Sequence, residues 1–345
     1  MVMMWDEISE QPVRLMKCYD SNKETIKKIV GEIKGKNISS VMIAARGTSD
    51  HAGMYAKYLI EYELGLPVAL ADSSIVTIYR RKMNLKNSLV IGISQSGAAQ
   101  DVLEVLKDAE NSGALTVSIT NDEASPLAKG ARYHLYCNAG PEKSVAATKT
   151  CSTEMFALAN LISEWSGNEE MKKELLTVPE NITKLFDKKD YIISRADRYR
   201  FMNECFVLAR GINYPIAIEA ALKFQETSYV KAQAYATSDF QHGPYAMIQK
   251  DTPVFVFAPN GPSLKDTTSM IEKLKNSEAD IIVFSNNKEV LAMGNISYEI
   301  PQTSNDMISP FYNLVMAQLF ACRLSLAKGL NPDSPRSLSK VTITR

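Results

Sequence analysis

LVIGISQSGAAQD, residues 89–101, indicates the fold class more clearly than any other stretch of the chain. Its first part, Leu89–Ser94, is a continuous apolar run of strand length, which is typical of a strand buried on both faces of a parallel sheet. Small and polar residues follow at once, and a helical pattern then continues to about Asn111. A buried strand that turns directly into a helix is the unit from which parallel α/β sheets are built.

The same alternation extends in both directions along the chain. In the first half we expect further strands at Val41–Ala45, Pro67–Ala71, Leu115–Thr120 and Tyr133–Cys137. In the second half we expect strands at Cys205–Ala209, Val254–Ala258, Asp280–Phe284 and Ile296–Ile300. Strands that alternate with helices form right-handed crossovers and a parallel sheet covered on both sides. The expected fold is therefore α/β, with two tandem domains that each hold a five-stranded parallel sheet flanked by helices in a flavodoxin-like or Rossmann-like sandwich.

The 345 residues suggest about two domains. We expect an N-terminal helical segment at 1–35, a first domain at 36–168, a helical linker at 169–200, a second domain at 201–330 and an extended C-terminal tail at 331–345. Ala45-Arg46-Gly47 and Ala209-Arg210-Gly211 each follow the first strand of a half, which indicates an internal repeat. The loops differ, because the first half has SQSG at 94–97 where the second has SNN at 285–287. This difference suggests that the first half binds a ligand and the second half reacts with it.

Composition excludes several classes of function. Lysine plus arginine equals aspartate plus glutamate, at 39 each, which argues against a nucleic-acid or anionic-membrane surface. The five cysteines are scattered without a metal-ligand spacing, so we expect free thiols in a reducing cytoplasm and no metal site. The first ten residues lack a signal-peptide pattern, and polar residues interrupt the most apolar segment, Ile308–Leu326, so we expect no membrane span.

Two loops rich in serine and threonine are expected at one edge of the first sheet. Ser94 and Ser96 follow one strand, and Thr48 and Ser49 follow another. Ligands bind open α/β sheets at the carboxyl ends of the strands, where amides at a helix N-terminus attract an anion. Together the loops predict a phosphate monoester site, although either loop alone is better explained as a helix cap. No GxxxxGK[ST] or GxGxxG is present, so neither a nucleoside triphosphate nor a dinucleotide is indicated.

The second half contains a helix with three charges in register. Within EAALKFQE, residues 219–226, the side chains of Glu219, Lys223 and Glu226 recur along one face. His242 follows sixteen residues after Glu226, in an HGP turn. A carboxylate, an amine and an imidazole that lie close together can transfer protons on a carbonyl compound. The alternative is a surface ion pair of little energetic value.

Six motifs occur in an order that resembles the sugar isomerase (SIS) family. They are RGTS (46–49), SQSG (94–97), SVAATK (144–149), the ARG…YPIAIEAALKFQE segment (209–226), HGP (242–244) and NPDSPRSLSKVT (331–342). More narrowly, the chain is similar to the isomerase half of glucosamine-6-phosphate synthase and to stand-alone deaminases of that family. The resemblance covers nearly the whole chain.

The resemblance implies a role for each matching position. The expected substrate and phosphate ligands are Thr48, Ser49, Ser94, Gln95, Ser96, Val145 and Ser339. The expected catalytic residues are Glu226, Lys223, His242 and Lys340. In this family the residue matching Glu226 moves a proton between C1 and C2 of the open-chain sugar, and Lys340 matches a tail lysine that contacts the sugar carbonyl, as a Schiff base in the synthase. The residue matching His242 opens the ring from a neighbouring subunit, which implies a homodimer.

The resemblance also sets the expected reaction. An aldose–ketose proton shift on an amino-sugar 6-phosphate, such as glucosamine 6-phosphate, would release ammonia and fructose 6-phosphate without a metal or redox cofactor. Ala98, Ala99 and Ala147 replace polar residues common in the family, and we expect no glutaminase domain. A fructosamine-type 6-phosphate deglycase and a non-catalytic sugar-phosphate-binding protein stay open as alternatives.

Overall fold

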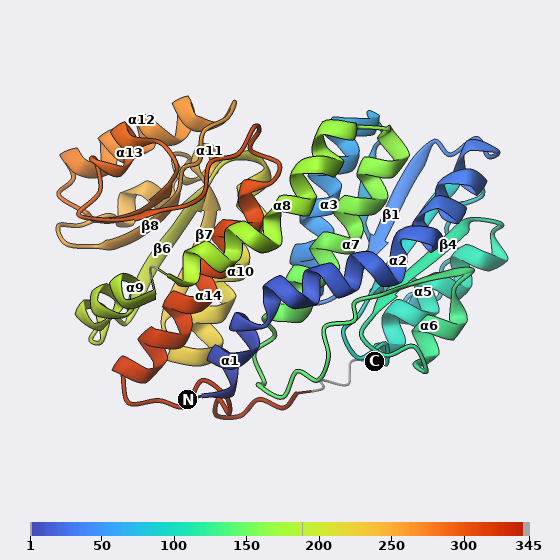
Figure 1. Cartoon of the computed structure of the whole chain (residues 1–345), viewed down its shortest axis with the longest axis horizontal. Helices are drawn as coiled ribbons and strands as arrows, with labels where there is room; N and C mark the ends of the chain where they lie inside the picture. The colour runs from blue at the N-terminus through green and yellow to red at the C-terminus, as the bar shows by residue number, and fades with distance from the viewer. Residues whose placement is uncertain (1, 188, 341–345) are drawn as a thin grey trace. The chain divides into compact units, whose positions relative to one another are not determined.

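Two parallel sheets organise the chain, each in its own structural unit (Figure 1). The computed structural model describes residues 2–187 and 189–340. The N-terminal unit comprises residues 10–142, 149–176 and 339–340, and the C-terminal unit comprises residues 2–9, 143–148, 177–187 and 189–338. The division therefore falls inside helix α8 (Glu169–Phe186). The domain boundaries expected from the sequence stay predictions.

The N-terminal unit is a five-stranded parallel sheet with helices around it, as expected. Its strand order is β2-β1-β3-β4-β5. The strands are β1 (Ser40–Ala44), β2 (Val68–Leu70), β3 (Ser88–Ile93), β4 (Leu115–Thr120) and β5 (Tyr133–Tyr136). The helices are α2 (Gln11–Lys34), α3 (Thr48–Leu64), α4 (Ser74–Thr77), α5 (Gln100–Asn111), α6 (Pro126–Gly130) and α7 (Lys149–Ser166). Because the order reverses between β1 and β3, the loops that follow these two strands flank the point where such sheets bind ligands.

The C-terminal unit repeats this topology. Its order is β7-β6-β8-β9-β10, with β6 (Glu204–Ala209), β7 (Lys231–Ala236), β8 (Pro253–Phe257), β9 (Asp280–Ser285) and β10 (Ile296–Glu299). The helices are α1 (Met3–Ser9), α9 (Lys189–Ala196), α10 (Tyr214–Ser228), α11 (Thr237–Phe240), α12 (Leu264–Asn276), α13 (Lys288–Leu291) and α14 (Ser309–Ala327), with 3-10 turns η1 (Asp197–Tyr199), η2 (Gly211–Asn213) and η3 (Pro244–Met247).

Strand β7 is the strand that sequence reasoning did not locate. Its sequence, KAQAYA, contains no continuous apolar run, because β7 is an edge strand of the sheet. Ala232 and Ala236 are buried, whereas Lys231 and Gln233 are exposed. The signal present was this weak alternation, which short segments share with helices.

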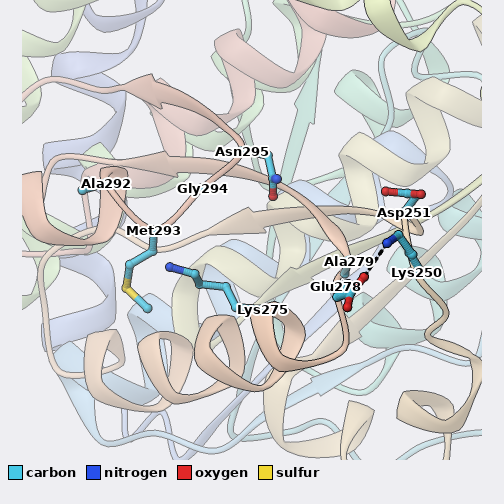
Figure 2. Close-up of a pocket in the computed structure, with 9 residues that line it drawn as sticks. All are labelled: Lys250, Asp251, Lys275, Glu278, Ala279, Ala292, Met293, Gly294 and Asn295. Carbon is cyan, nitrogen blue, oxygen red and sulfur yellow. Dashed lines mark ion pairs between the residues drawn. The ribbon is translucent and has the colours of Figure 1, made fainter.

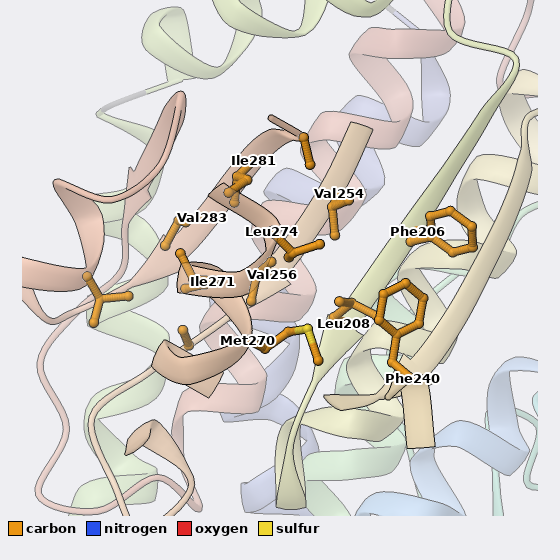
Figure 3. Packing of buried hydrophobic residues seen from close by; sticks show 13 residues of the cluster. Phe206, Leu208, Phe240, Val254, Val256, Met270, Ile271, Leu274, Ile281 and Val283 are labelled. Atoms are coloured by element: carbon orange, nitrogen blue, oxygen red, sulfur yellow. The ribbon is translucent and has the colours of Figure 1, made fainter. Parts of the chain in front are cut away.

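Side chains of the central strands alternate between two buried faces. On β8, Val254 and Val256 join an apolar cluster with residues of α12 (Figure 3). The residue between them, Phe255, points to the other face, where its ring lies 4.9 Å from that of Phe224 on α10 and 5.0 Å from that of Phe320 on α14. Burial on both faces explains why these strands read as continuous apolar runs.

The internal repeat extends to an ion pair. After β1, Arg46 places its Nε 2.6 Å from Oδ2 of Asp101 in the first turn of α5. After β6, Arg210 places its Nε 3.7 Å from Oδ2 of Asp266 in the first turn of α12. The two pairs occupy equivalent positions, so the two halves share a local detail as well as a topology.

Replacement of Gly97 by alanine is expected to destabilise the loop that follows β3. Gly97 has φ +62°, and an added Cβ would lie 2.1 Å from the Ser125 hydroxyl, which caps α6 by accepting the Ala128 amide. Gly65→Ala is the matched control, because Gly65 has φ +63° with open space around it. In urea unfolding, we expect a loss of about 1 kcal/mol for Gly65→Ala from backbone strain. For Gly97→Ala we expect about 2–3 kcal/mol, because the cap is disturbed as well. Equal losses would contradict the clash.

Candidate functional site

The charged face of helix α10 forms a buried triad. The Nζ of Lys223 lies 2.5 Å from Oε2 of Glu226 and 3.3 Å from Oε1 of Glu219. The side chains of Lys223 and Glu219 are 0% and 1% exposed, and that of Glu226 is 22% exposed. The surface-pair alternative is therefore wrong, and the predicted register of three charges on one face is confirmed. Glu226 is the member of the triad that reaches solvent.

The triad lies near the edge of its sheet where the strands begin. Helix α10 returns antiparallel to β6, and the Lys231 amide at the start of β7 donates to the carbonyl of Asn203, just before β6. Lys223 and Glu226 occupy the last turns of α10, so they are at this amino edge. Open α/β sheets usually bind ligands at the opposite edge. The rule that ligands bind at the carboxyl ends of parallel strands, from which the phosphate loops were predicted, does not predict the position of this triad.

His242 does not join the triad within one chain. Phe240 and Tyr245, which flank it, pack with the apolar cluster on the α12 face of the sheet, whereas α10 covers the other face. The side chain of His242 is exposed. The segment that holds His242 therefore packs on the face of the sheet opposite α10, and the expected role of His242 in a neighbouring subunit stays a prediction.

The tail contacts the end of α10. Tyr229, which follows the last residue of α10 as its C-cap, has a left-handed backbone with φ 54°. The Arg336 amide donates to the Tyr229 hydroxyl at 2.8 Å, and the Arg336 guanidinium lies 4.1 Å from the centre of the Tyr229 ring. Residues 331–340 contain no helix or strand, as the sequence predicted for this part of the tail, and residues 341–345 lie outside the described residues.

Helix α1 links the tail to the segment that contains Val145. The side-chain carboxylate of Asp333 accepts the Met3 and Met4 amides at 2.8 and 2.7 Å. The backbone carbonyl of Asp333 accepts the Val145 amide at 3.2 Å. Glu7, a buried residue of α1, accepts the amides of the two residues before Val145. These hydrogen bonds give the expected substrate residue Val145 a defined backbone position.

The SQSG loop has the geometry of a tight strand-to-helix turn. The Gly97 amide donates to the Ser94 carbonyl at 3.0 Å, and Ser94 and Gln95 are also tied to the neighbouring strand β4 and the loop that follows it. The Ser96 hydroxyl accepts the Ala98 amide at 3.3 Å. Ala99 gives α5 no side-chain cap, although the Val102 amide in the first turn donates to Oδ1 of Asp101 at 2.9 Å. The tight turn and the absence of a cap from Ala99 are consistent with the predicted phosphate site.

The loop after β1 contains Thr48 and Ser49 in the first turn of α3. The Ser49 hydroxyl donates to Oε1 of Glu154 on α7 at 2.9 Å, and Ser49 is buried. Burial raises the pKa of the neighbouring Asp50 carboxyl, while His51 and Arg46 act in the opposite direction. Thr48 is half-buried. These contacts place the loop beside acidic groups, which sequence reasoning did not anticipate.

Lys340 and Gln95 both contact Glu142, a residue that sequence reasoning missed. Lys340 Nζ lies 3.0 Å from Oε2 of Glu142, and the Gln95 side-chain amide donates to the same oxygen at 2.7 Å. Ser339, next to Lys340, is exposed. Glu142 stands just before the SVAATK motif, and only its position beside that motif could have drawn attention to it.

Each unit therefore gathers part of the expected site. The N-terminal unit brings Gln95 together with Lys340, and the C-terminal unit brings Lys223 together with Glu226. The functional roles of these residues stay predictions.

An open pocket of about 460 Å³ lies elsewhere in the C-terminal unit (Figure 2). Its lining comes largely from the segments before β8, β9 and β10, and two of the lining residues, Lys250 and Glu278, form an ion pair of 2.7 Å. None of the expected site residues lines this pocket. It is exposed and polar, so size alone does not make it the functional site.

The described residues also bear on three other features: metal-ligand clusters, membrane-spanning helices and reactive cysteines. Among residues 2–187 and 189–340, no group of three or more histidine, cysteine, aspartate and glutamate side chains could hold a metal ion. Within the same residues, no helix combines the length and the apolar character that crossing a membrane requires. The five cysteines are buried free thiols, and burial raises the pKa of Cys18 to about 12, which makes a thiolate nucleophile unfavourable there.

The fold and the strand-to-helix loops define a class of protein with two doubly wound parallel α/β units. The family model described as "SIS domain" matches this chain twice, at residues 36–163 and 202–328. The chain belongs to the SIS family.

The relatives agree with this assignment. The glutamine–fructose-6-phosphate aminotransferase (isomerizing) of Clostridium tetani is 32% identical over 356 aligned positions, which cover 98% of this chain and 58% of the relative. The chain thus spans a little over half the length of that protein. The C-terminal domain of glucosamine-fructose-6-phosphate aminotransferase from Francisella tularensis superposes with a TM-score of 0.87 at 27% identity, covering 96% of this chain and 98% of that one. Glucosamine-6-phosphate deaminase from Thermotoga maritima shares the fold, with a TM-score of 0.81 at 22% identity and coverage of 99% and 100%.

Proposed function

We propose that this protein is a phosphosugar isomerase that acts on an amino-sugar 6-phosphate and converts glucosamine 6-phosphate to fructose 6-phosphate and ammonia. The observation that carries the proposal is the buried lysine of α10, Lys223, held between Glu219 and Glu226. A charge cluster buried in an apolar helix interface is costly unless it is paired, and buried charge clusters of this kind often occur at functional sites.

The proposed chemistry needs a base and a source of positive charge. Glu226, partly exposed and hydrogen-bonded to Lys223, would take the carbon-bound proton and return it to the adjacent carbon. Lys223 keeps this carboxylate in place, and a cation or donor near the sugar oxygen would stabilise the developing oxyanion. Lys340 is assigned to the sugar carbonyl, and the loops at 48–49 and 94–96 are assigned to the phosphate. With a 2-amino sugar the proton shift gives a ketimine, which water hydrolyses to the ketose and ammonia.

The relatives support the substrate class. The similar proteins are named as isomerizing aminotransferases of fructose 6-phosphate, and the alignment covers 98% of this chain in one of them. Deamination is the finer part of the proposal. It comes from the resemblance of the SVAATK motif to stand-alone deaminases and deglycases, and from the C-terminal motif, whose lysine belongs to the amino-sugar branch of the family.

We further propose that the protein works as a homodimer in the cytoplasm. His242 is exposed, and its neighbours Phe240 and Tyr245 pack on the face of the sheet opposite α10, so a second copy would supply this imidazole for ring opening. The five free thiols fit the expected reducing compartment.

The deciding experiment measures ammonia release from glucosamine 6-phosphate by the purified protein, with fructose 6-phosphate quantified by a coupled assay. Release of both products in equal amounts is the expected result. Turnover of fructosamine 6-phosphates alone would keep the mechanism and change the substrate to that of a deglycase. Tight binding of a sugar phosphate without turnover of any would show a binding protein and would overturn the enzymatic proposal.

A further inference from the structure

Glu142 is a buried carboxylate at the start of a long helix. Its side chain is fully buried, and it accepts the Thr150 amide and the Thr150 hydroxyl, both at 3.1 Å, in the first turn of α7. An anion at a helix N-terminus is stabilised by the free amides and the helix dipole. These contacts fix the orientation of the carboxylate within the N-terminal unit.

Two side chains of the expected site converge on one oxygen of this carboxylate. Oε2 of Glu142 accepts the Gln95 amide at 2.7 Å and lies 3.0 Å from the Nζ of Lys340. Gln95 belongs to the SQSG loop after β3, and Lys340 belongs to the tail, 198 residues from Glu142 along the chain. A buried carboxylate is favourable only where cations and donors surround it, so Glu142 attracts the lysine of an otherwise irregular tail.

We propose that Glu142 is a positioning residue that holds the Lys340 amine at the SQSG loop before substrate arrives. This inference rests on the proposed role of Lys340 at the sugar carbonyl. Residues 331–340 have no secondary structure to fix the amine, and the side chain of Lys340 is only 25% exposed, so a specific partner must determine its place. The Gln95 contact gives Glu142 a second effect, because it orients a side chain of the expected phosphate loop.

The first test measures the accessibility of Lys340 and needs no turnover. The full-length wild type, Glu142→Gln and Glu142→Asp are treated with an amine-reactive acetylating reagent, and mass spectrometry follows modification of Lys340. Loss of one charge-assisted hydrogen bond is expected to raise the labelling rate of Lys340 by about tenfold in Glu142→Gln. Glu142→Asp keeps the charge and should label more slowly than Glu142→Gln. Unchanged labelling of Lys340 in a folded Glu142→Gln protein would overturn the inference.

The second test separates this inference from the proposed function. Borohydride traps an imine between Lys340 and the sugar phosphate, and the adduct is detected on the Lys340 peptide. We expect trapping in the wild type and at least about tenfold slower trapping in Glu142→Gln. Equal trapping in both would overturn the role of Glu142 alone. Normal turnover without trapping in the wild type, together with full activity of Lys340→Met, would overturn the role of Lys340 and with it this inference.

A double-mutant cycle excludes a merely structural role. If Glu142 acts through Lys340, then Glu142→Gln should lower kcat when Lys340 is present. The same substitution should have little further effect on kcat in a protein that already carries Lys340→Met. Additive losses in kcat would contradict positioning. Glu61→Gln, which removes an exposed carboxylate that pairs with the half-buried Lys57, is the matched control and should change neither labelling nor kcat.

Discussion

Glu226→Gln is expected to lower kcat for sugar-phosphate turnover by about a thousandfold, the contribution typical of a positioned general base. The glutamine keeps the size of the side chain and can still accept a hydrogen bond from Lys223, which now lies 2.5 Å from the carboxylate. It cannot take a proton from carbon. Because Glu226 is 22% exposed while Lys223 also contacts Glu219, the change should affect chemistry far more than folding.

The measurement combines steady-state turnover with isotope exchange. In D2O the wild type should incorporate solvent deuterium at C1 or C2, and Glu226→Gln should do so at a rate reduced in parallel with kcat. Glu272→Gln, an exposed acid of α12, is the control and should leave kcat unchanged. A kcat for Glu226→Gln within about threefold of the wild-type value would exclude Glu226 as the base, since general bases contribute far more than this.

Lys223→Met is expected to destabilise the fold by about 3–5 kcal/mol, the loss typical when one partner of a buried ion pair is removed. The methionine fills much of the volume, so the main loss is electrostatic. Glu219, which is 1% exposed, would lose the ammonium group that lies 3.3 Å from its carboxylate. Urea unfolding at neutral pH, monitored by circular dichroism, measures the free energy of unfolding.

The double variant Glu219→Gln/Lys223→Met identifies the cause of that loss. It removes the buried carboxylate together with the ammonium group, so it should be more stable than Lys223→Met alone. Lys184→Met is the surface control, because the Lys184–Glu180 pair of α8 is exposed on both sides, and it should cost less than about 1 kcal/mol. A double variant less stable than Lys223→Met would show that the loss of stability comes from packing and not from the unpaired carboxylate of Glu219.

Local sequence predicted the central strands well because their signal is local. Strands such as β3 and β9 are buried along their whole length, and a continuous apolar run between polar turns is typical of such strands. The edge strand β7 was missed, because only two of its six residues are buried and its small side chains leave no strong pattern.

The site could be predicted only where its members share one element. Glu219, Lys223 and Glu226 follow helical periodicity, so their common face was readable from spacing alone. The separation of His242 from the triad was not readable, because it depends on which face of the sheet each segment packs against. Glu142 was missed for the same reason, since Lys340 lies far from it in the chain.

The α/β class, the duplicated sheet, the order of motifs and the register of charges on α10 could all be read from the amino-acid sequence, because periodicity and buried runs are properties of neighbouring residues. The full burial of Lys223, the position of His242 across the sheet from α10 in its own chain, and the carboxylate of Glu142 shared by Lys340 and Gln95 became visible only in the folded chain. Burial and long-range pairing arise when distant segments pack together, and no local pattern records them.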